Sequence, residues 1–311
     1  MKFLLIQRRA LGDALYTSLV SDVLKKEFPD AKIYLLTLEP LCELIENLPI
    51  DRCIAYKSLV DAVKRIRKIK PDVVLDYEAT FKTYPLVILS GAKKRIAFYK
   101  KKREKLLYPI YTDLIDYIDY GFTFWDRLRL LKALEVDYER YIKKRYLPKA
   151  FPKGSKKEEY IVITPKGKLK GKTISPERVK VLFDKLTDFY EVKVCVEPKE
   201  KEYTEHLKSL GIPVLNLNMR EFKELLSRSK GLITVEAFPY HLALLLGIKS
   251  LVVLQSTGPF VKETFGLIRY YRPPLDCLEC HKKVCPKGTY ECTFTIGENK
   301  LIREALEFFS S

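Results

Sequence analysis

Apolar residues along the chain follow two alternating patterns. Short apolar runs that predict buried strands lie at residues 3–7, 32–37 and 72–76. Segments whose apolar residues recur every three or four positions, which predicts helices, lie at residues 14–28, 59–69 and 84–90. Strand and helix follow one another in turn, as in parallel sheets with right-handed crossovers. The first part of the chain is therefore expected to form a doubly wound α/β domain.

The same alternation restarts in the second half. Strands are expected at residues 160–164, 191–196, 231–235 and 250–254, and helices at residues 176–189, 201–210 and 239–246. Between the halves, residues 140–159 carry prolines, a glycine and lysine runs, which is typical of a linker. We therefore expect two doubly wound domains, residues 1–150 and 151–311. Ligands in such sheets bind at the carboxyl ends of the strands.

The composition indicates a folded protein with an anionic partner. Hydrophobic residues make up 47% of the chain, which excludes a disordered protein. Lys and Arg number 57 against 40 acidic residues, so the net charge is +17 and an anionic partner is expected. Nucleic acid, a membrane surface and phosphorylated small molecules all fit that charge. The apolar start is too short for a signal peptide, and no run approaches the ~20 residues of a membrane span. A cytoplasmic location is therefore expected.

The chain has seven cysteines. In the cytoplasm, free thiols or metal ligands are favoured over disulfides. Four of the cysteines cluster at Cys277, Cys280, Cys285 and Cys292. This spacing fits a tetrahedral structural zinc, and the alternatives are free thiols or a disulfide formed under oxidation.

The loop after the first strand holds a candidate catalytic group. Gly12 permits a tight turn, and Asp13 stands where the chain enters the helix. Its carboxylate is suited to act as a general base toward a bound hydroxyl. The alternative is that Asp13 only caps the helix.

Two loops of the second half hold candidate ligand-binding groups. Lys168 and Lys172 lie among glycines ahead of a helix, where backbone N–H groups and the helix dipole favour phosphate. A solvated basic loop is the alternative. Glu236 ends a strand, and His241 lies in the next helix, either at the binding edge or as a core histidine. Thr257 and Gly258 follow a further strand and are small enough to lie against a ligand.

A basic segment at residues 93–105 interleaves cations with aromatic residues. Its cations include Lys93, Arg95, Lys101 and Arg103. Such a segment can bind nucleic acid, dock on an anionic membrane or hold a phosphorylated glycolipid, and a solvated surface loop is the alternative.

Several of these motifs occur together in one known family. Leu11-Gly12-Asp13 with Thr17, Lys172, Glu236 with His241-Leu242-Ala243, and Thr257-Gly258-Pro259 resemble the lipopolysaccharide heptosyltransferases of glycosyltransferase family 9. Residues 91–96 and Trp125-Asp126-Arg127 extend the resemblance over nearly the whole chain.

The resemblance implies a GT-B fold, in which two Rossmann-like domains face a cleft. Residues 1–150 would form the acceptor-side domain and residues 151–311 the nucleotide-sugar-binding domain. The implied reaction is an inverting transfer of heptose, or a related sugar, from an ADP-sugar to the inner core of lipopolysaccharide. It needs no metal for catalysis, so zinc would be structural only. The enzyme would contact the inner face of the cytoplasmic membrane peripherally, and nucleic acid is not an expected partner.

The resemblance also implies roles for individual residues. Asp13 is the expected catalytic base. The expected donor-binding residues are Gly12, Lys168, Lys172, Glu236, His241, Thr257 and Gly258. The expected acceptor-binding residues are Lys93, Arg95, Lys101 and Arg103.

The chain departs from the family at Glu236-Ala237-Phe238, where Asp-Thr-Gly is usual. This change removes a hydroxyl and a flexible glycine from the expected donor pocket. Two alternatives therefore stand beside the enzyme: a family member that binds sugar nucleotide without turnover, and a basic nucleic-acid-binding protein with a zinc site.

Overall fold

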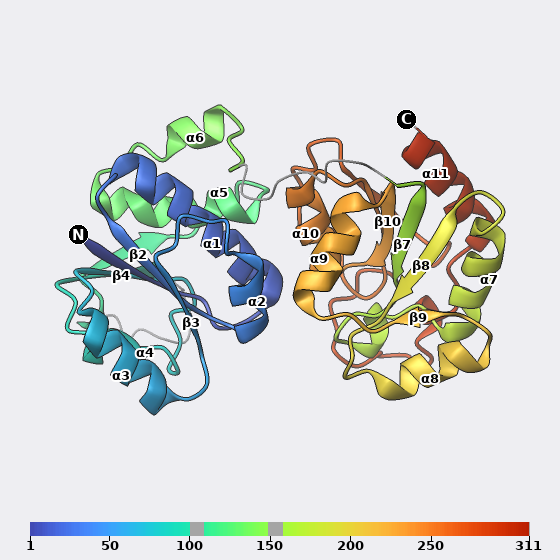
Figure 1. The fold of residues 1–311 in the computed structure, drawn as a ribbon, viewed down its shortest axis with the longest axis horizontal. Coiled ribbons are helices and arrows are strands. Elements are labelled where there is room, and N and C mark those ends of the chain that lie inside the picture. Colours follow the sequence, from blue (N-terminus) through green and yellow to red (C-terminus); the bar gives the residue numbers. More distant parts are fainter. Residues whose placement is uncertain (100–108, 149–157, 311) are drawn as a thin grey trace. The chain divides into compact units, whose positions relative to one another are not determined.

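The computed structural model describes residues 1–99, 109–148 and 158–310. The chain divides into two compact units, Met1–Ala150 and Phe151–Ser311, each built around one six-stranded sheet (Figure 1). Among the described residues, no helix is long and apolar enough to cross a membrane. The expectation of two Rossmann-like α/β domains is confirmed.

The first unit contains one parallel sheet of order β3-β2-β1-β4-β5-β6. Its strands are β1 (Lys2–Ile6), β2 (Lys32–Thr37), β3 (Arg52–Ala55), β4 (Val73–Asp76), β5 (Lys94–Tyr99) and β6 (Asp113–Asp116). Its helices are α1 (Leu11–Glu27), α2 (Glu39–Leu44), α3 (Leu59–Ile69), α4 (Tyr84–Leu89), α5 (Thr123–Leu128), the 3₁₀ helix η2 (Arg129–Leu134) and α6 (Glu139–Lys143).

Side chains of the central strands alternate between two helical layers. Leu4 and Ile6 of β1 pack with Ile66 of α3 and Val87 of α4 in one buried cluster. Phe3 points to the other face, where its ring meets Phe28 at the end of α1. Figure 1 shows α1 and α5 on one side of this sheet and α3 and α4 on the other. Because both faces are covered, β1 and β4 read as continuous apolar runs.

The second unit repeats the plan, with a parallel sheet of order β12-β11-β10-β7-β8-β9. Its strands are β7 (Tyr160–Thr164), β8 (Glu191–Cys195), β9 (Val214–Leu215), β10 (Gly231–Val235), β11 (Ser250–Val253) and β12 (Ile268–Tyr271). Its helices are η3 (Lys170–Lys172), α7 (Pro176–Leu186), α8 (Lys201–Ser209), α9 (Met219–Arg228), α10 (Phe238–Leu246), η4 (Glu291–Thr293) and α11 (Glu298–Ser310). Ile161 and Ile233 pack on Leu182 of α7 and Leu301 of α11.

The strand order reverses once in each sheet, between β1 and β4 and between β7 and β10. Successive crossovers leave the sheet on opposite faces at these points, so the loops after the two strands part and leave room for a ligand. The candidate residues Asp13, Lys172 and Glu236 follow β1, β7 and β10, respectively.

The predicted linker at residues 140–159 begins too early. The short helix α6 occupies Glu139–Lys143, and Tyr146 beyond it still belongs to the first unit: its hydroxyl donates to Asp22 of α1, and its backbone carbonyl accepts from the Trp125 indole at 2.9 Å. These contacts explain why a basic, proline-containing stretch is partly folded.

The preference for free thiols or metal ligands over disulfides is wrong for one pair of cysteines. Cys42 of α2 and Cys53 of β3 are disulfide-bonded, with their Cα atoms 5.6 Å apart. The expectation rested on the redox compartment alone. The structure brings the two thiols together because α2 packs directly on the neighbouring edge strand β3.

This disulfide generates a test. In protein purified without reductant and unfolded in guanidinium, five thiols should react with a thiol reagent, and seven after reduction. Reduction should lower the free energy of unfolding by roughly 2–3 kcal/mol, because the bond closes a short loop in the unfolded chain. The double variant Cys42→Ser/Cys53→Ser should show no effect of reductant. Seven reactive thiols before reduction would contradict the bond.

Candidate functional site

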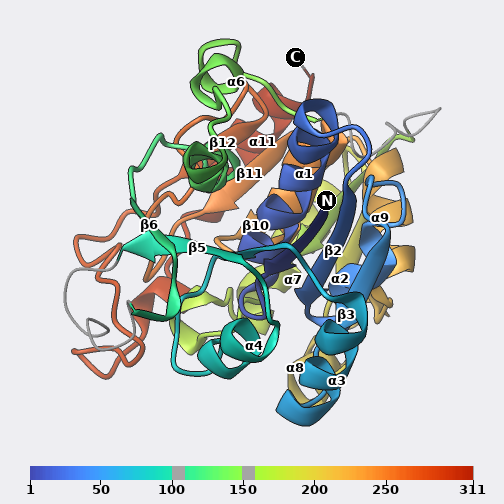
Figure 2. The same cartoon turned by 90° about the vertical axis from the view of Figure 1, so that its left-hand side faces the viewer.

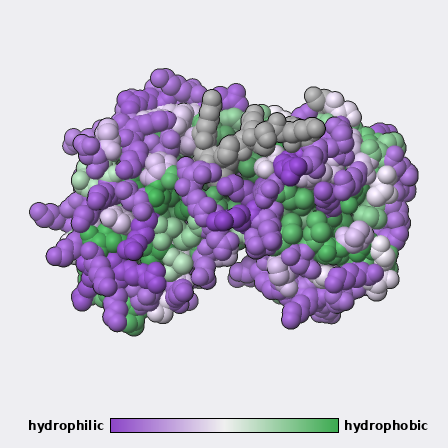
Figure 3. Space-filling model, viewed as in Figure 1, coloured by the Kyte–Doolittle hydropathy of each residue, from purple (hydrophilic) through white to green (hydrophobic). Residues whose placement is uncertain are grey.

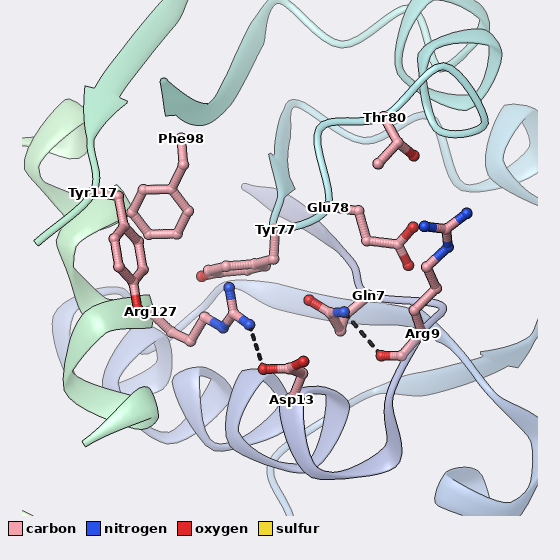
Figure 4. Close-up of a pocket in the computed structure, with 9 residues that line it drawn as sticks. All are labelled: Gln7, Arg9, Asp13, Tyr77, Glu78, Thr80, Phe98, Tyr117 and Arg127. Carbon is pink, nitrogen blue, oxygen red and sulfur yellow. Dashed lines mark hydrogen bonds and ion pairs between the residues drawn. The ribbon is translucent and has the colours of Figure 1, made fainter. Parts of the chain in front are cut away.

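A cavity of about 440 Å³ lies at the switch point of the first sheet. Its lining residues follow the carboxyl ends of β1, β4 and β6, or lie in α1, at the carboxyl end of β5 or in α5: Gln7, Arg9, Asp13, Tyr77, Glu78, Thr80, Phe98, Tyr117 and Arg127. Figure 4 shows Asp13 on the first turn of α1, below Arg127 and the Tyr77 ring. The cavity therefore combines two carboxylates, two arginines and three aromatic rings within reach of solvent.

Asp13 lines this cavity and does not cap α1. Ala10 occupies the N-cap position, without a side-chain cap, so Asp13 is the third residue of the helix. The cap alternative is therefore wrong. Gly12 also lies inside the first helical turn, and the tight turn falls instead at Ala10, whose φ of 52° is in the region that favours glycine.

Arg127 holds the Asp13 carboxylate. One guanidinium nitrogen lies 2.9 Å from Asp13 Oδ1, and the Asp13 side chain is 32% exposed. Arg127 also lies over the Tyr77 ring, 5.5 Å from its centroid. The motif Trp125-Asp126-Arg127 entered the sequence analysis only as part of a resemblance. The sequence analysis missed Arg127 as a site residue. In the structure it is a buried arginine on the short helix α5.

Two further groups fix the end of β4. Arg8 and Glu78 form a buried ion pair at 2.8 Å. Asp76 is buried and accepts hydrogen bonds from the Tyr111 hydroxyl at 2.7 Å and from the backbone N–H of Glu78 at 3.0 Å. Burial raises the pKa of Asp76 above its usual range despite these bonds. The β1 and β4 loops are thus tied to each other beside the cavity.

In the second unit, Glu236 joins three loops. Its carboxylate accepts hydrogen bonds from Lys172, from the Thr257 hydroxyl at 2.9 Å and from the Tyr240 hydroxyl at 3.1 Å. Burial alone would raise the pKa of Glu236, but the Lys172 ammonium holds it below the usual range. The predicted donor residues Lys172, Glu236 and Thr257 do converge, and Tyr240 is a member that the sequence analysis missed.

His241 lies within α10, next to this cluster. Its ring packs on the Tyr240 ring, with centroids 3.9 Å apart, and burial lowers the pKa of His241 to about 4. The imidazole is therefore neutral near pH 7. This environment fits the core-histidine alternative more closely than a charged donor contact.

The lysine-rich loop before α7 folds back on itself. Lys166 and Thr173 form a bridge, and a Cβ on Gly167 would lie 2.8 Å from the Lys172 carbonyl oxygen, so glycine is required there. Lys168 is exposed and is not among the groups that contact Glu236. A Cβ on Gly258 would lie 2.5 Å from Glu279 Oε2, so this glycine packs against a carboxylate.

The cysteine segment is part of the same edge. Backbone N–H groups of Glu279 and His281 donate to the Gln255 and Ser256 carbonyls, each at 2.7 Å. The charges of Cys277, Cys285 and Cys280 contribute to the raised pKa of Cys292, about 11, whose main cause is burial. Within the residues that the structure describes, no three ligand-type side chains are arranged as a metal site. Structural zinc therefore stays a prediction.

The structure does not bring Lys93 or Arg95, two of the expected acceptor cations, to the cavity. Lys93 precedes β5 and Arg95 lies at its amino end, whereas Phe98, at the other end, lines the cavity. The Arg95 guanidinium donates to the carbonyls of Ile110 and Ala92, at 2.6 and 2.8 Å. Lys101 and Arg103 lie outside the described residues. Among the described residues, the cations that line the cavity are Arg9 and Arg127.

Comparison with known proteins gives matches by structure. The sequence matches no model of a known protein family and no curated protein. A glycosyltransferase family 9 protein from Veillonella parvula superimposes with a TM-score of 0.78 at 16% identity, covering 99% of this chain and 97% of the other. The E. coli heptosyltransferase WaaC with ADP-2-deoxy-2-fluoro heptose gives a TM-score of 0.72 at 17% identity, covering 99% of both chains.

E. coli ADP-heptose lps heptosyltransferase II gives a TM-score of 0.69 at 15% identity, covering 98% of this chain and 100% of the other. At such identities the likeness establishes the fold. The chain has the GT-B fold, as expected from the sequence. The solved structures it resembles include family 9 and heptosyltransferase structures, the family named from its motifs.

The buried His241 predicts that the free energy of unfolding depends on pH. The unfolded chain binds a proton at His241 below about pH 6.5, and the folded unit binds it only near pH 4. The free energy of unfolding should therefore fall by roughly 3 kcal/mol as the pH drops through this window. Urea unfolding of His241→Gln should show a flatter profile, and the exposed His206→Gln serves as the control. An unchanged slope in His241→Gln would contradict a neutral buried imidazole.

The zinc prediction needs metal analysis. Protein purified without chelator should carry about one zinc per chain, because four thiolates complete a tetrahedral shell. The variant Cys285→Ser/Cys292→Ser should lose the metal, while Cys195→Ser, a buried cysteine of β8, should keep it. A wild-type chain essentially free of zinc would sink the prediction.

Proposed function

We propose that the protein is an inverting glycosyltransferase that moves heptose, or a related sugar, from an ADP-sugar to the inner core of lipopolysaccharide. The observation that carries the proposal is the position of Asp13. It is a partly exposed carboxylate at the switch point of a GT-B domain, held by Arg127 inside a cavity of about 440 Å³. E. coli heptosyltransferase WaaC, whose fold this chain shares, has been solved with ADP and with ADP-2-deoxy-2-fluoro heptose.

Asp13 is the proposed base. An acceptor hydroxyl in the cavity donates a proton to the Asp13 carboxylate as its oxygen attacks the anomeric carbon of the donor. Arg127 keeps the carboxylate in one orientation, because its guanidinium contacts Oδ1 and is itself held over Tyr77. The three aromatic rings of the cavity suit the apolar faces of a sugar.

The Glu236 cluster is the proposed donor site. Lys172 is the cation there, and its ion pair with Glu236 holds it at the carboxyl edge of the sheet before any donor binds. An incoming diphosphate competes with Glu236 for the ammonium and for the Thr257 hydroxyl. These donors then stabilise the charge that develops on the departing nucleotide. This step requires no metal.

The proposed setting follows from the substrates. The acceptor is an anionic glycolipid, so we place the enzyme in the cytoplasm, in peripheral contact with the inner face of the cytoplasmic membrane. Among the described residues, no membrane-spanning helix supplies that contact. We propose that a surface of the folded protein makes that contact.

The test is transfer from ADP-heptose to a heptose-free inner-core acceptor. The variant Asp13→Asn keeps size and one hydrogen-bond acceptor but takes no proton, so turnover should fall by about 10²- to 10⁴-fold. Its thermal stabilisation by ADP should match that of the wild type, because the donor site lies in the other unit. Asp22→Asn, the same change on α1 away from the cavity lining, should keep the wild-type rate.

Three results would contradict the proposal. A near-wild-type rate in Asp13→Asn would refute the base assignment. Thermal stabilisation by oligonucleotides and not by ADP or ADP-sugars would replace the enzyme with a nucleic-acid-binding protein. Stabilisation by ADP-sugar without any transfer would leave a sugar-nucleotide-binding protein.

A further inference from the structure

Large apolar side chains are exposed on two neighbouring helices of the first unit and on the turn before the second. Their exposed fractions are 39% for Leu59, 70% for Val60, 63% for Phe81, 54% for Ile88 and 39% for Leu89. Single exposed apolar residues are common on soluble proteins, but a group of them on adjoining elements marks an interaction surface. None of these five residues is used in the proposed reaction.

The two helices form one continuous surface. Ile66 of α3 and Val87 of α4 belong to the same buried cluster, and Figures 1 and 2 both show α3 and α4 side by side. The carboxyl ends of the two helices also meet, because Arg67 Nε of α3 lies 3.4 Å from the carbonyl oxygen of Leu89 in α4. The exposed residues of α3, Ile88 and Leu89 of α4, and Phe81 before α4 therefore form one surface, which we call the α3–α4 face.

Cations surround the apolar residues on this face. Helix α3 carries Lys64, Arg65, Arg67 and Lys68 against a single carboxylate, Asp61, which pairs with Arg65 at 3.0 Å. Further exposed cations follow α3 and flank α4: Lys70, Lys82 and Lys93. Figure 3 shows hydrophobic residues among hydrophilic ones where Figure 1 places these helices.

We propose that the α3–α4 face docks on an anionic lipid bilayer. Apolar side chains that enter the headgroup region and cations that meet lipid phosphate are the two components of interfacial membrane binding. Nucleic acid would account for the cations alone. Val60, Ile88 and Leu89 are aliphatic, whereas single strands are bound by stacking on aromatic rings.

The face adjoins the cavity of the same unit. Thr80 lines that cavity, and the next residue, Phe81, is an exposed member of the α3–α4 face. The Phe81 ring is held against Tyr84, with centroids 5.6 Å apart. A bilayer on this face therefore lies beside the part of the cavity wall that Thr80 forms, from where it would present a glycolipid headgroup to Asp13. This last link rests on the proposed function, but the docking does not.

The test is co-sedimentation of the full chain with two kinds of vesicle: phosphatidylcholine alone, and phosphatidylcholine with phosphatidylglycerol. Wild-type protein should bind the anionic vesicles and release them as salt is raised. The variant Lys64→Gln/Arg67→Gln/Lys68→Gln should bind about 100-fold more weakly, since each cation near an anionic surface contributes about fivefold. The variant Val60→Ser/Phe81→Ser/Ile88→Ser should lose at least about tenfold.

Matched changes in the second unit are the control. The variant Lys185→Gln/Lys201→Gln/Lys208→Gln removes the same charge from exposed positions of α7 and α8, and Phe189→Ser removes a ring that is 59% exposed. Both controls should bind vesicles as the wild type does. All variants change exposed side chains, so thermal melting should stay close to wild type.

Three results would overturn the docking proposal. They are equal binding to neutral and anionic vesicles, wild-type binding by both α3–α4 variants, and a charge-only effect accompanied by full competition from a single-stranded oligonucleotide. The vesicles contain no acceptor sugar and no donor is added. Loss of vesicle binding is thus independent of failure of the transfer reaction, and transfer to a soluble, delipidated acceptor should be unchanged in both variants.

Discussion

Parallel pairing of all strands in each sheet is the constraint on which both candidate sites depend. It places every strand's carboxyl end at one edge, so loops far apart in sequence meet there. Asp13 and Arg127 are separated by 114 residues yet form an ion pair, and Lys172 meets Glu236 across 64 residues. The reversal of strand order then leaves space between the loops, and the cavity of the first unit occupies that space.

The two units use opposite electrostatic arrangements at equivalent edges. In the first unit the Asp13 carboxylate lines the cavity, and Arg127, which lines it too, supplies the counter-charge. In the second unit a lysine is the group suited to an anion, and the buried carboxylate of Glu236 supplies the counter-charge. Pairing is required in both cases because an isolated buried charge is too costly. One domain type thus presents a carboxylate, the proposed base, in one place and a lysine, the proposed phosphate contact, in the other.

The central part of the fold could be predicted from sequence because its strands are buried on both faces. Segments such as Tyr160–Thr164 and Gly231–Val235 read as unbroken apolar runs. Outer strands escaped prediction: β6 is only partly buried, and β9 has two residues. Asp13, Lys172 and Glu236 were found because they follow predicted strands. Arg127 and Tyr240 come from helices. The spacing of apolar residues in a helix predicts its buried face, but it does not predict which polar side chain reaches a neighbouring loop.

The backbone at Ala10 has a consequence for how this protein can change. A non-glycine residue at positive φ costs about 1–3 kcal/mol, and here it stands between Arg9 of the cavity and the first turn of α1. Glycine at this position would relieve that cost in the folded state. It would also raise the conformational entropy of the unfolded chain and make the turn itself more flexible. One methyl group therefore affects both the free energy of unfolding and the placement of Asp13 at the cavity.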